Sequence, residues 1–172
     1  SNLVQQGRVE EAIGSFGHAE VAGVCDKLGD VHEGQGSFFK ALEMYEAALQ
    51  IRKRELGEEH GDVGDSYHKV GSVCHTLGQY QRALDLFDRA LEIRSGTFGE
   101  EHGSVGETYT GIGAVYTILG RHSKALENNQ KGLDIQRKAL GEEHASVGIA
   151  YKNIGLAFYE LWEHDKALEQ YQ

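Results

Sequence analysis

The sequence predicts an all-α fold, an α-solenoid of tandem helix–turn–helix units. The first observation is a motif, LGEEH at residues 56–60, which returns in nearly the same form at residues 98–102 and 140–144, 42 residues apart each time. A fixed period of this size indicates an array of repeated units. The second observation is that small and apolar residues recur at helical spacing on both sides of an internal glycine in each period. We therefore expect two helices per period, stacked so that each unit contacts its neighbours.

The period divides the chain into an incomplete unit followed by four further units. Residues 6–16 match the second helix of the later units, with Phe16 at the position of Phe87. Gly17 then matches Glu101, so the 13 residues that correspond to 88–100 have no counterpart here. The expected boundaries are 1–20 for the incomplete unit and 21–62, 63–104, 105–146 and 147–172 for the others, the last one truncated.

Each complete unit is expected to contain a first and a second helix. The first helices are predicted near 21–35, 63–77, 105–119 and 147–161, and the second helices near 37–54, 79–96, 121–138 and 163–172. A tight turn between the two helices is predicted at Gly36, Gly78 and Gly120, and Trp162 occupies the fourth such position. The sequence contains no proline, so no predicted helix is interrupted by a helix-breaking proline.

The expected helix ends follow known capping preferences. A glycine in the left-handed conformation would end three second helices, at Gly57, Gly99 and Gly141. Basic residues, Arg52 and Arg94 among them, lie near the negative ends of these helices. Asp62, Ser104 and Ser146 are expected to cap the next first helix, and Ser104 with Glu107 has the spacing of a capping box.

Apolar stripes explain why the units must stack. In the second unit they comprise Tyr67, Val70, Gly71 and Cys74 on the first helix and Ala83, Leu84, Phe87, Ala90 and Leu91 on the second. Mid-helix glycines at positions 71, 113 and 155 favour close helix approach, which would offset a cost of about 1 kcal/mol relative to alanine. The third unit differs, because Asn128, Asn129 and Gly132 replace the larger apolar residues. Buried amides would need partners, or Trp162 would fill the space.

Composition narrows the function classes. The formal net charge of −10 disfavours nucleic acid or an anionic membrane as the main partner. No apolar run approaches the roughly 20 residues that a membrane helix needs, and the first residues lack the pattern of a signal peptide. Cys25 and Cys74 both fall on apolar stripes and are interpreted as reduced core residues. We therefore expect a cytoplasmic protein.

The small and large positions of three units form one common pattern. They are Tyr67, Val70, Gly71, Cys74, Gly78, Ala83, Phe87 and Ala90; then Tyr109, Ile112, Gly113, Tyr116, Gly120 and Ala125; then Tyr151, Ile154, Gly155, Phe158, Ala167 and Tyr171. This pattern resembles the tetratricopeptide repeat in its 42-residue form, as found in kinesin light chains. The resemblance implies a right-handed superhelix whose concave groove is lined by the first helices. It also implies that an asparagine in each first helix holds peptide backbone, a residue that only Asn153 retains here.

No catalytic, cofactor or metal site is expected. Histidines at positions 18, 60, 102 and 144 form a ladder, but repetition explains it, since packed helices lie about 10 Å apart and zinc–nitrogen bonds are about 2.0–2.1 Å long. The paired carboxylates Glu58 and Glu59 fall in an exposed loop, where a raised pKa is not expected. The sequence therefore favours an interaction module over an enzyme.

The candidate binding residues lie on the first-helix face opposite the apolar stripe. They are Asp26, Asp30, Glu33, His68, Ser72, His75, Thr110, Ala114, Thr117, Ile118, Lys152, Asn153, Leu156 and Tyr159. Their chemistry changes from acidic in the first unit to cationic and apolar in the fourth. We expect a peptide or a partner helix, with a basic segment at the acids and an apolar anchor at Leu156 and Tyr159.

Two alternatives remain at this point. The candidate positions could be solvated residues that are free to vary. The chain could instead be a structural segment of a longer solenoid, built permanently into a large assembly, which would self-associate through its open ends.

Overall fold

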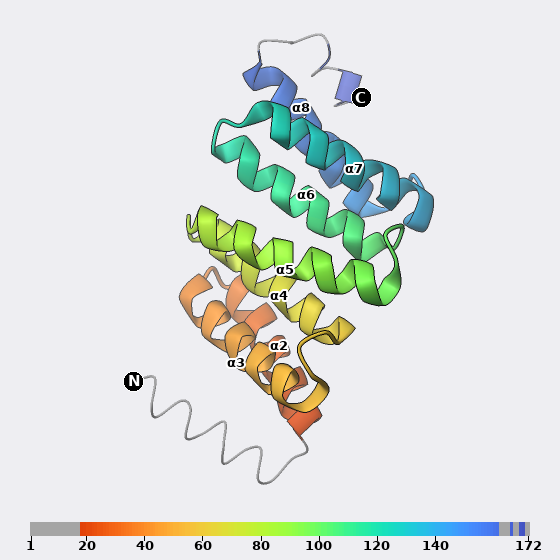
Figure 1. The fold of residues 1–172 in the computed structure, drawn as a ribbon. Helices are drawn as coiled ribbons and strands as arrows, with labels where there is room; N and C mark the ends of the chain where they lie inside the picture. Colours follow the sequence, from red (N-terminus) through yellow and green to blue (C-terminus); the bar gives the residue numbers. More distant parts are fainter. Residues whose placement is uncertain (1–17, 162–165, 167–168, 171–172) are drawn as a thin grey trace.

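The computed structural model describes residues 18–161, 166 and 169–170. This part of the chain forms seven α-helices and contains no strand (Figure 1). The helices are α2 (His18–Gly34), α3 (Phe38–Leu56), α4 (Gly61–Thr76), α5 (Tyr80–Phe98), α6 (Gly103–Ile118), α7 (His122–Leu140) and α8 (Ala145–Glu160). Several expectations concern residues outside the described ranges. They are the second helix at residues 6–16, the 13-residue gap after Phe16 and the position of Trp162. The last second helix, at 163–172, lies largely outside them as well.

The helices pack in chain order, as an all-α solenoid requires. The pairs α2–α3, α4–α5 and α6–α7 form units 1, 2 and 3, and α8 begins the next unit. Each second helix also packs against the first helix of the following unit (Figure 1). The first helices α6 and α8 contact each other as well, and α4 touches α6, whereas no comparable contact joins α3, α5 and α7, the second helices that the structure describes. The first helices therefore lie closer together than the second helices do.

Two kinds of glycine shape the connections. Inside the units, Gly36, Gly78 and Gly120 have φ angles of 70°, 74° and 67°, which is the left-handed conformation expected for a tight turn. Gly57 combines φ 87° with ψ 159°, and the glycines at 99 and 141 do the same. The sequence predicted a positive φ at these three glycines, in the left-handed helical conformation. The observed combination of positive φ with extended ψ is a different region, which is accessible essentially to glycine alone.

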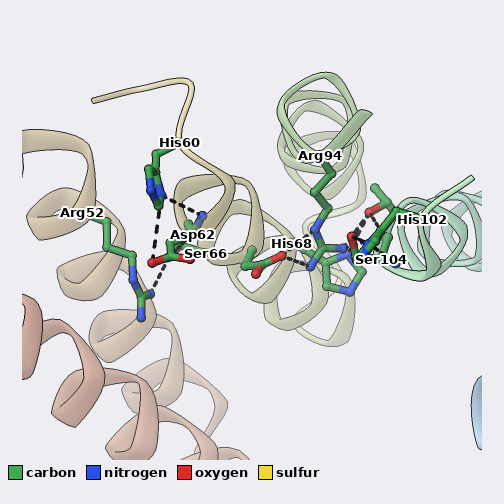
Figure 2. Close-up of polar contacts among 10 residues, drawn as sticks. Arg52, His60, Asp62, Ser66, His68, Arg94, His102 and Ser104 are labelled. Atoms are coloured by element: carbon green, nitrogen blue, oxygen red, sulfur yellow. Dashed lines mark hydrogen bonds and ion pairs between the residues drawn. The ribbon is translucent and has the colours of Figure 1, made fainter. Parts of the chain in front are cut away.

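The N-caps differ from those that the sequence suggested. The caps of α4, α6 and α8 are His60, His102 and His144, each two residues before the expected Asp62, Ser104 and Ser146. The histidine Nδ1 accepts the backbone N–H of the second residue of each helix, at 3.2, 3.3 and 3.3 Å (Figure 2 shows the caps of α4 and α6). The expected capping box at Ser104 is therefore wrong. Three of the four histidines in the ladder have a structural function, because each satisfies a helix-end donor.

Close packing explains the mid-helix glycines. A Cβ added at Gly71 would lie 3.0 Å from the Phe87 ring, and one added at Gly29 would lie 2.4 Å from Tyr45. The second helix thus presses an aromatic side chain against the backbone of its own first helix. Cys25 and Cys74 are free and buried in these cores, as the sequence indicated. No helix in the described ranges is both long and apolar enough to cross a membrane.

Unit 3 replaces this aromatic contact with polar groups. Asn129 is fully buried over Gly113, and neither atom of its amide has a hydrogen-bond partner among the described residues. Gly132 allows a closer approach of α6 and α7, since a Cβ there would lie 2.5 Å from Thr110 Oγ1 and 2.7 Å from the Gly106 carbonyl oxygen. The neighbouring Asn128 is only partly buried and donates to the Lys124 carbonyl at 2.8 Å.

We expect the substitution Asn129→Leu to raise the free energy of unfolding by about 1–3 kcal/mol, because it removes an unsatisfied buried amide and keeps a similar shape. Urea denaturation measures the change. Asn128→Leu is the matched control and should give no gain, since that amide is hydrogen-bonded and reaches solvent. A loss of stability in Asn129→Leu would mean that the buried amide is engaged.

Candidate peptide-binding surface

The acids of unit 1 are held by neighbouring side chains. The Tyr45 hydroxyl donates to Asp30 at 2.7 Å and to Glu33 at 2.9 Å. Lys69 of α4 donates to Asp30 at 3.0 Å, and its Nζ lies 5.0 Å from the centre of the Tyr45 ring. The hydrogen bond from Tyr45 lowers the pKa of Asp30, and burial together with the two carboxylates raises the pKa of Tyr45. This acidic pair is therefore already partly compensated within the chain.

Asp26 takes part in the junction between units 1 and 2. Arg52 of α3 donates to Asp26 Oδ2 and to Ser66 Oγ, both at 2.6 Å (Figure 2 shows the Ser66 contact). The other oxygen of Asp26 is buried without a hydrogen-bond partner among the described residues. An open pocket of about 160 Å³ lies here, lined by Asp26, Arg52, Asp62, Asp65, Ser66 and Lys69. Its opposite charges lie side by side, so it does not form a purely acidic surface.

The same junction recurs 42 residues later. Arg94 of α5 is buried and donates to the Ser104 carbonyl and to Thr108 Oγ1, both at 2.8 Å, while its other nitrogens hold Asp65 (Figure 2). At the third junction the equivalent residue is Gln136; with its amide nitrogen assigned toward Ser146, it donates to the Ser146 carbonyl at 3.0 Å and accepts from the Glu107 N–H at 3.2 Å.

These junction residues correct one expectation from the sequence. Arg52 and Arg94 do not simply complement a helix end, because each reaches into the next unit. The signal that could have identified them is the matching spacing of a hydroxyl partner: Ser66 and Thr108 face the arginines, whereas Ala150 stands at the equivalent position beside Gln136.

Two of the expected surface residues pack against neighbouring side chains, and one of them, Thr110, is buried. Thr110 is buried against Gly132 and donates to the Gly106 carbonyl at 3.1 Å. His68 is partly buried, with its ring centre 5.3 Å from that of Phe87 and its Nδ1 3.4 Å from Thr108 Oγ1. Burial, with the nearby charge of Arg94, lowers the pKa of His68 to about 3. The structure therefore encloses Thr110, whereas His68 keeps intermediate exposure beside Phe87.

The middle of the expected surface is partly buried. Ser72, His75, Ala114 and Thr117 all have intermediate exposure, as does Asn153. Thr117 donates to the carbonyl of Gly113 at 3.0 Å, within its own helix. Burial lowers the pKa of His75, whose Nε2 has no hydrogen-bond partner among the described residues. These residues offer small and neutral groups.

The apolar end of the expected surface is open. Ile118 at the end of α6 and Tyr159 at the end of α8 are 54% and 56% exposed, and Leu156 is 38% exposed. Lys152 on α8 is exposed as well. The structure thus brings large apolar side chains to solvent on two first helices that contact each other. Among the described residues, no group of three histidine, cysteine or acidic side chains is placed to hold a metal ion.

The helix pairs and their contacts define a class, the α-solenoids of tandem helix–turn–helix repeats. A model of the tetratricopeptide repeat matches residues 22–96, 64–138 and 104–172, which together include most of the chain. The protein therefore belongs to the tetratricopeptide repeat family. No curated protein matches this sequence.

Solved structures support the fold. BtubC (BKLC) from P. vanneervenii is 22% identical with a TM-score of 0.77, and the match covers 87% of this chain and 60% of BtubC. A putative kinesin light chain from Podosopora anserina with nearly identical repeats is 23% identical with a TM-score of 0.67, over 96% of this chain and 84% of that one. A Rap protein complexed with competence and sporulation factor is 22% identical with a TM-score of 0.72, over 83% of this chain and 38% of that one. This chain spans less than two thirds of BtubC and of the Rap protein.

Proposed function

We propose that this protein is a cytoplasmic interaction scaffold that binds an extended peptide or a partner helix on the face of its first helices. The single observation that carries the proposal is the exposure of Ile118, Leu156 and Tyr159 at the ends of α6 and α8. Exposed apolar side chains that gather on one face mark interaction surfaces. The free and buried cysteines favour a reducing compartment.

The shape of the array supports the choice of face. We assign the first-helix layer to the inner side of the curve, because α8 contacts α6 and α4 touches α6, whereas no comparable contact joins the described second helices α3, α5 and α7. An inner surface surrounds a ligand on more sides than an outer one. The Rap protein of similar fold was solved in complex with competence and sporulation factor, which supports a binding function for this chain without indicating the face.

The partner is expected to bind mainly through an apolar anchor. The acids of unit 1 are partly compensated by Tyr45, Lys69 and Arg52, so they add a weaker attraction for a basic segment. Charge pairs at an open surface contribute little and are screened by salt, whereas truncation of an aromatic anchor commonly costs 2 kcal/mol or more.

The experiment begins with a pull-down and mass spectrometry to identify the partner, followed by titration calorimetry at low and high salt. We expect Tyr159→Ala to weaken binding by about tenfold or more, and to weaken it more than Asp30→Ala does. Only the contribution of Asp30 should depend strongly on ionic strength. Phe39→Ala is the matched control, because Phe39 is an exposed aromatic residue on the second helix α3 and its loss should leave the affinity unchanged.

Unchanged affinity in both Tyr159→Ala and Asp30→Ala would remove this face from consideration. It would leave the alternative in which the chain is a permanent structural segment of a large assembly.

A further inference from the structure

The outer face of α2 carries three apolar side chains that the repeat pattern normally covers. Val24, Leu28 and Val31 are 55%, 45% and 54% exposed. Their counterparts 42 residues later, Ser66, Val70 and Val73, are at most 1% exposed. The counterparts in α6 and α8 are also buried. In each of those helices, the second helix of the preceding unit covers the face.

The chain contains a sequence suited to cover this face. Residues 7–16 have the pattern of a second helix, with Ala12, Ile13 and Phe16 at the positions of Ala41, Leu42 and Tyr45. These three counterparts are buried, and Leu42 and Tyr45 share one core cluster with Val70 and Val73 of the next unit. A second helix of this pattern is therefore the matching occupant.

The connection to α2 is too short for this segment to cover its own α2 in the usual register. In unit 2, Phe87 lies 11 residues before the end of α5, which is about 16 Å of helix, and four further residues lead to α6. Here only Gly17 separates Phe16 from the first residue of α2, a reach of about 8 Å. The segment could fold back onto its own α2 only if residues 13–17 formed the connecting loop. Ile13 and Phe16 would then no longer be available to pack against α2.

We propose that a second copy of this chain supplies residues 7–16 to cover the outer face of α2, so that two copies exchange these segments in a symmetric dimer. Shortening a hinge loop is a known route to such exchange. The orientation is suitable. Within one chain, a second helix runs antiparallel to the first helix that follows it. A twofold axis perpendicular to α2 would likewise place residues 7–16 of one copy antiparallel to α2 of the other.

The observed junction between units 1 and 2 gives the register of the exchange. There Leu42 belongs to the same cluster as Val73, and Lys69 lies over the Tyr45 ring. The equivalent arrangement between copies places Phe16 against Lys27 and brings Ile13 into one apolar cluster with Val31. An antiparallel pairing of the two copies in this register has its twofold axis near residue 22.

The test measures the mass of the full chain in solution by light scattering over a concentration series. We expect twice the 19.0 kDa of one chain. Val31→Asp should halve this mass, whereas Phe39→Asp, which changes an exposed apolar residue of α3, should leave it unchanged. A monomeric wild-type chain, or a dimer that persists in Val31→Asp, would overturn the proposal.

A second variant separates exchange from simple association. Inserting a copy of residues 88–100 between Phe16 and Gly17 restores the missing part of the unit, so the segment can cover its own α2 and the chain should become monomeric. Mixing an Ile13→Cys chain with a Val31→Cys chain under oxidising conditions should give a disulfide-linked pair. An insertion variant that stays dimeric, or a mixture without the cross-link, would refute the exchange. The groove proposed above is not involved, so these outcomes are independent of it.

Discussion

Phe87→Ala should lower the free energy of unfolding by about 3–5 kcal/mol, the usual cost of truncating a large buried aromatic residue. The Phe87 ring is 1% exposed and lies 3.0 Å from the position of a Cβ at Gly71 and 2.9 Å from one at Gly111. It therefore joins the two helices of unit 2 to the first helix of unit 3. Urea denaturation followed by circular dichroism measures the loss.

The control for Phe87→Ala is Phe39→Ala, because Phe39 is a phenylalanine of a second helix that is 70% exposed. Its truncation should change stability by less than about 0.5 kcal/mol, as is usual for surface positions. A loss below 1 kcal/mol in Phe87→Ala would show that the units are not coupled through this ring.

Acidification should destabilise the protein through His68. Burial lowers the pKa of His68 to about 3 in the folded state, whereas an unfolded histidine has a pKa of about 6.5. Between pH 6.5 and pH 3 the unfolded state binds a proton on His68 that the folded state does not bind. The contribution of neutral His68 to the free energy of unfolding is therefore fully present above pH 6.5 and decreases as the pH falls towards 3. The slope from this residue is at most about 1.4 kcal/mol per pH unit.

The measurement is a series of urea denaturation curves between pH 7 and 4 for the wild type and for His68→Asn, which keeps a polar side chain without a titrating group. The variant should show a shallower decrease of stability with acid, because one titrating group has been removed. Equal slopes in the two proteins would show that His68 is protonated with an ordinary pKa in the folded state.

The fold could be predicted because its causes are local and repeated. The helical spacing of Val70 and Cys74, and the glycine at position 71 opposite Phe87, fix how a pair packs, and the 42-residue period then fixes how pairs stack. The caps could not be predicted from residue preferences, because His60 is not a favoured N-cap type and accepts through Nδ1 only in the observed ring orientation.

The candidate surface was less predictable because exposure depends on neighbouring helices. Thr110 occupies a position that should face solvent, but Gly132 on α7 lets the two helices approach until the threonine is enclosed. Asp26 was expected to be available to a ligand, and Arg52 from another helix binds it. The burial of Thr110 and the pairing of Asp26 each depend on a residue of another helix, 22 or 26 positions away. The residue pattern within one helix does not reveal such a partner.

The junction residues have a consequence for how such an array can evolve. Arg52 and Arg94 each donate to a hydroxyl in the next unit, whereas at the third junction Gln136 bonds to backbone groups and Ala150 occupies the sequence position of the hydroxyl residue. A duplicated or transposed unit could place an arginine such as Arg94 opposite Ala150, which has no hydroxyl to accept from it. It could also place Gln136 opposite Thr108, whose hydroxyl would then lack the arginine. We therefore expect recombination between the repeats to disrupt a junction unless the two neighbouring units are exchanged together.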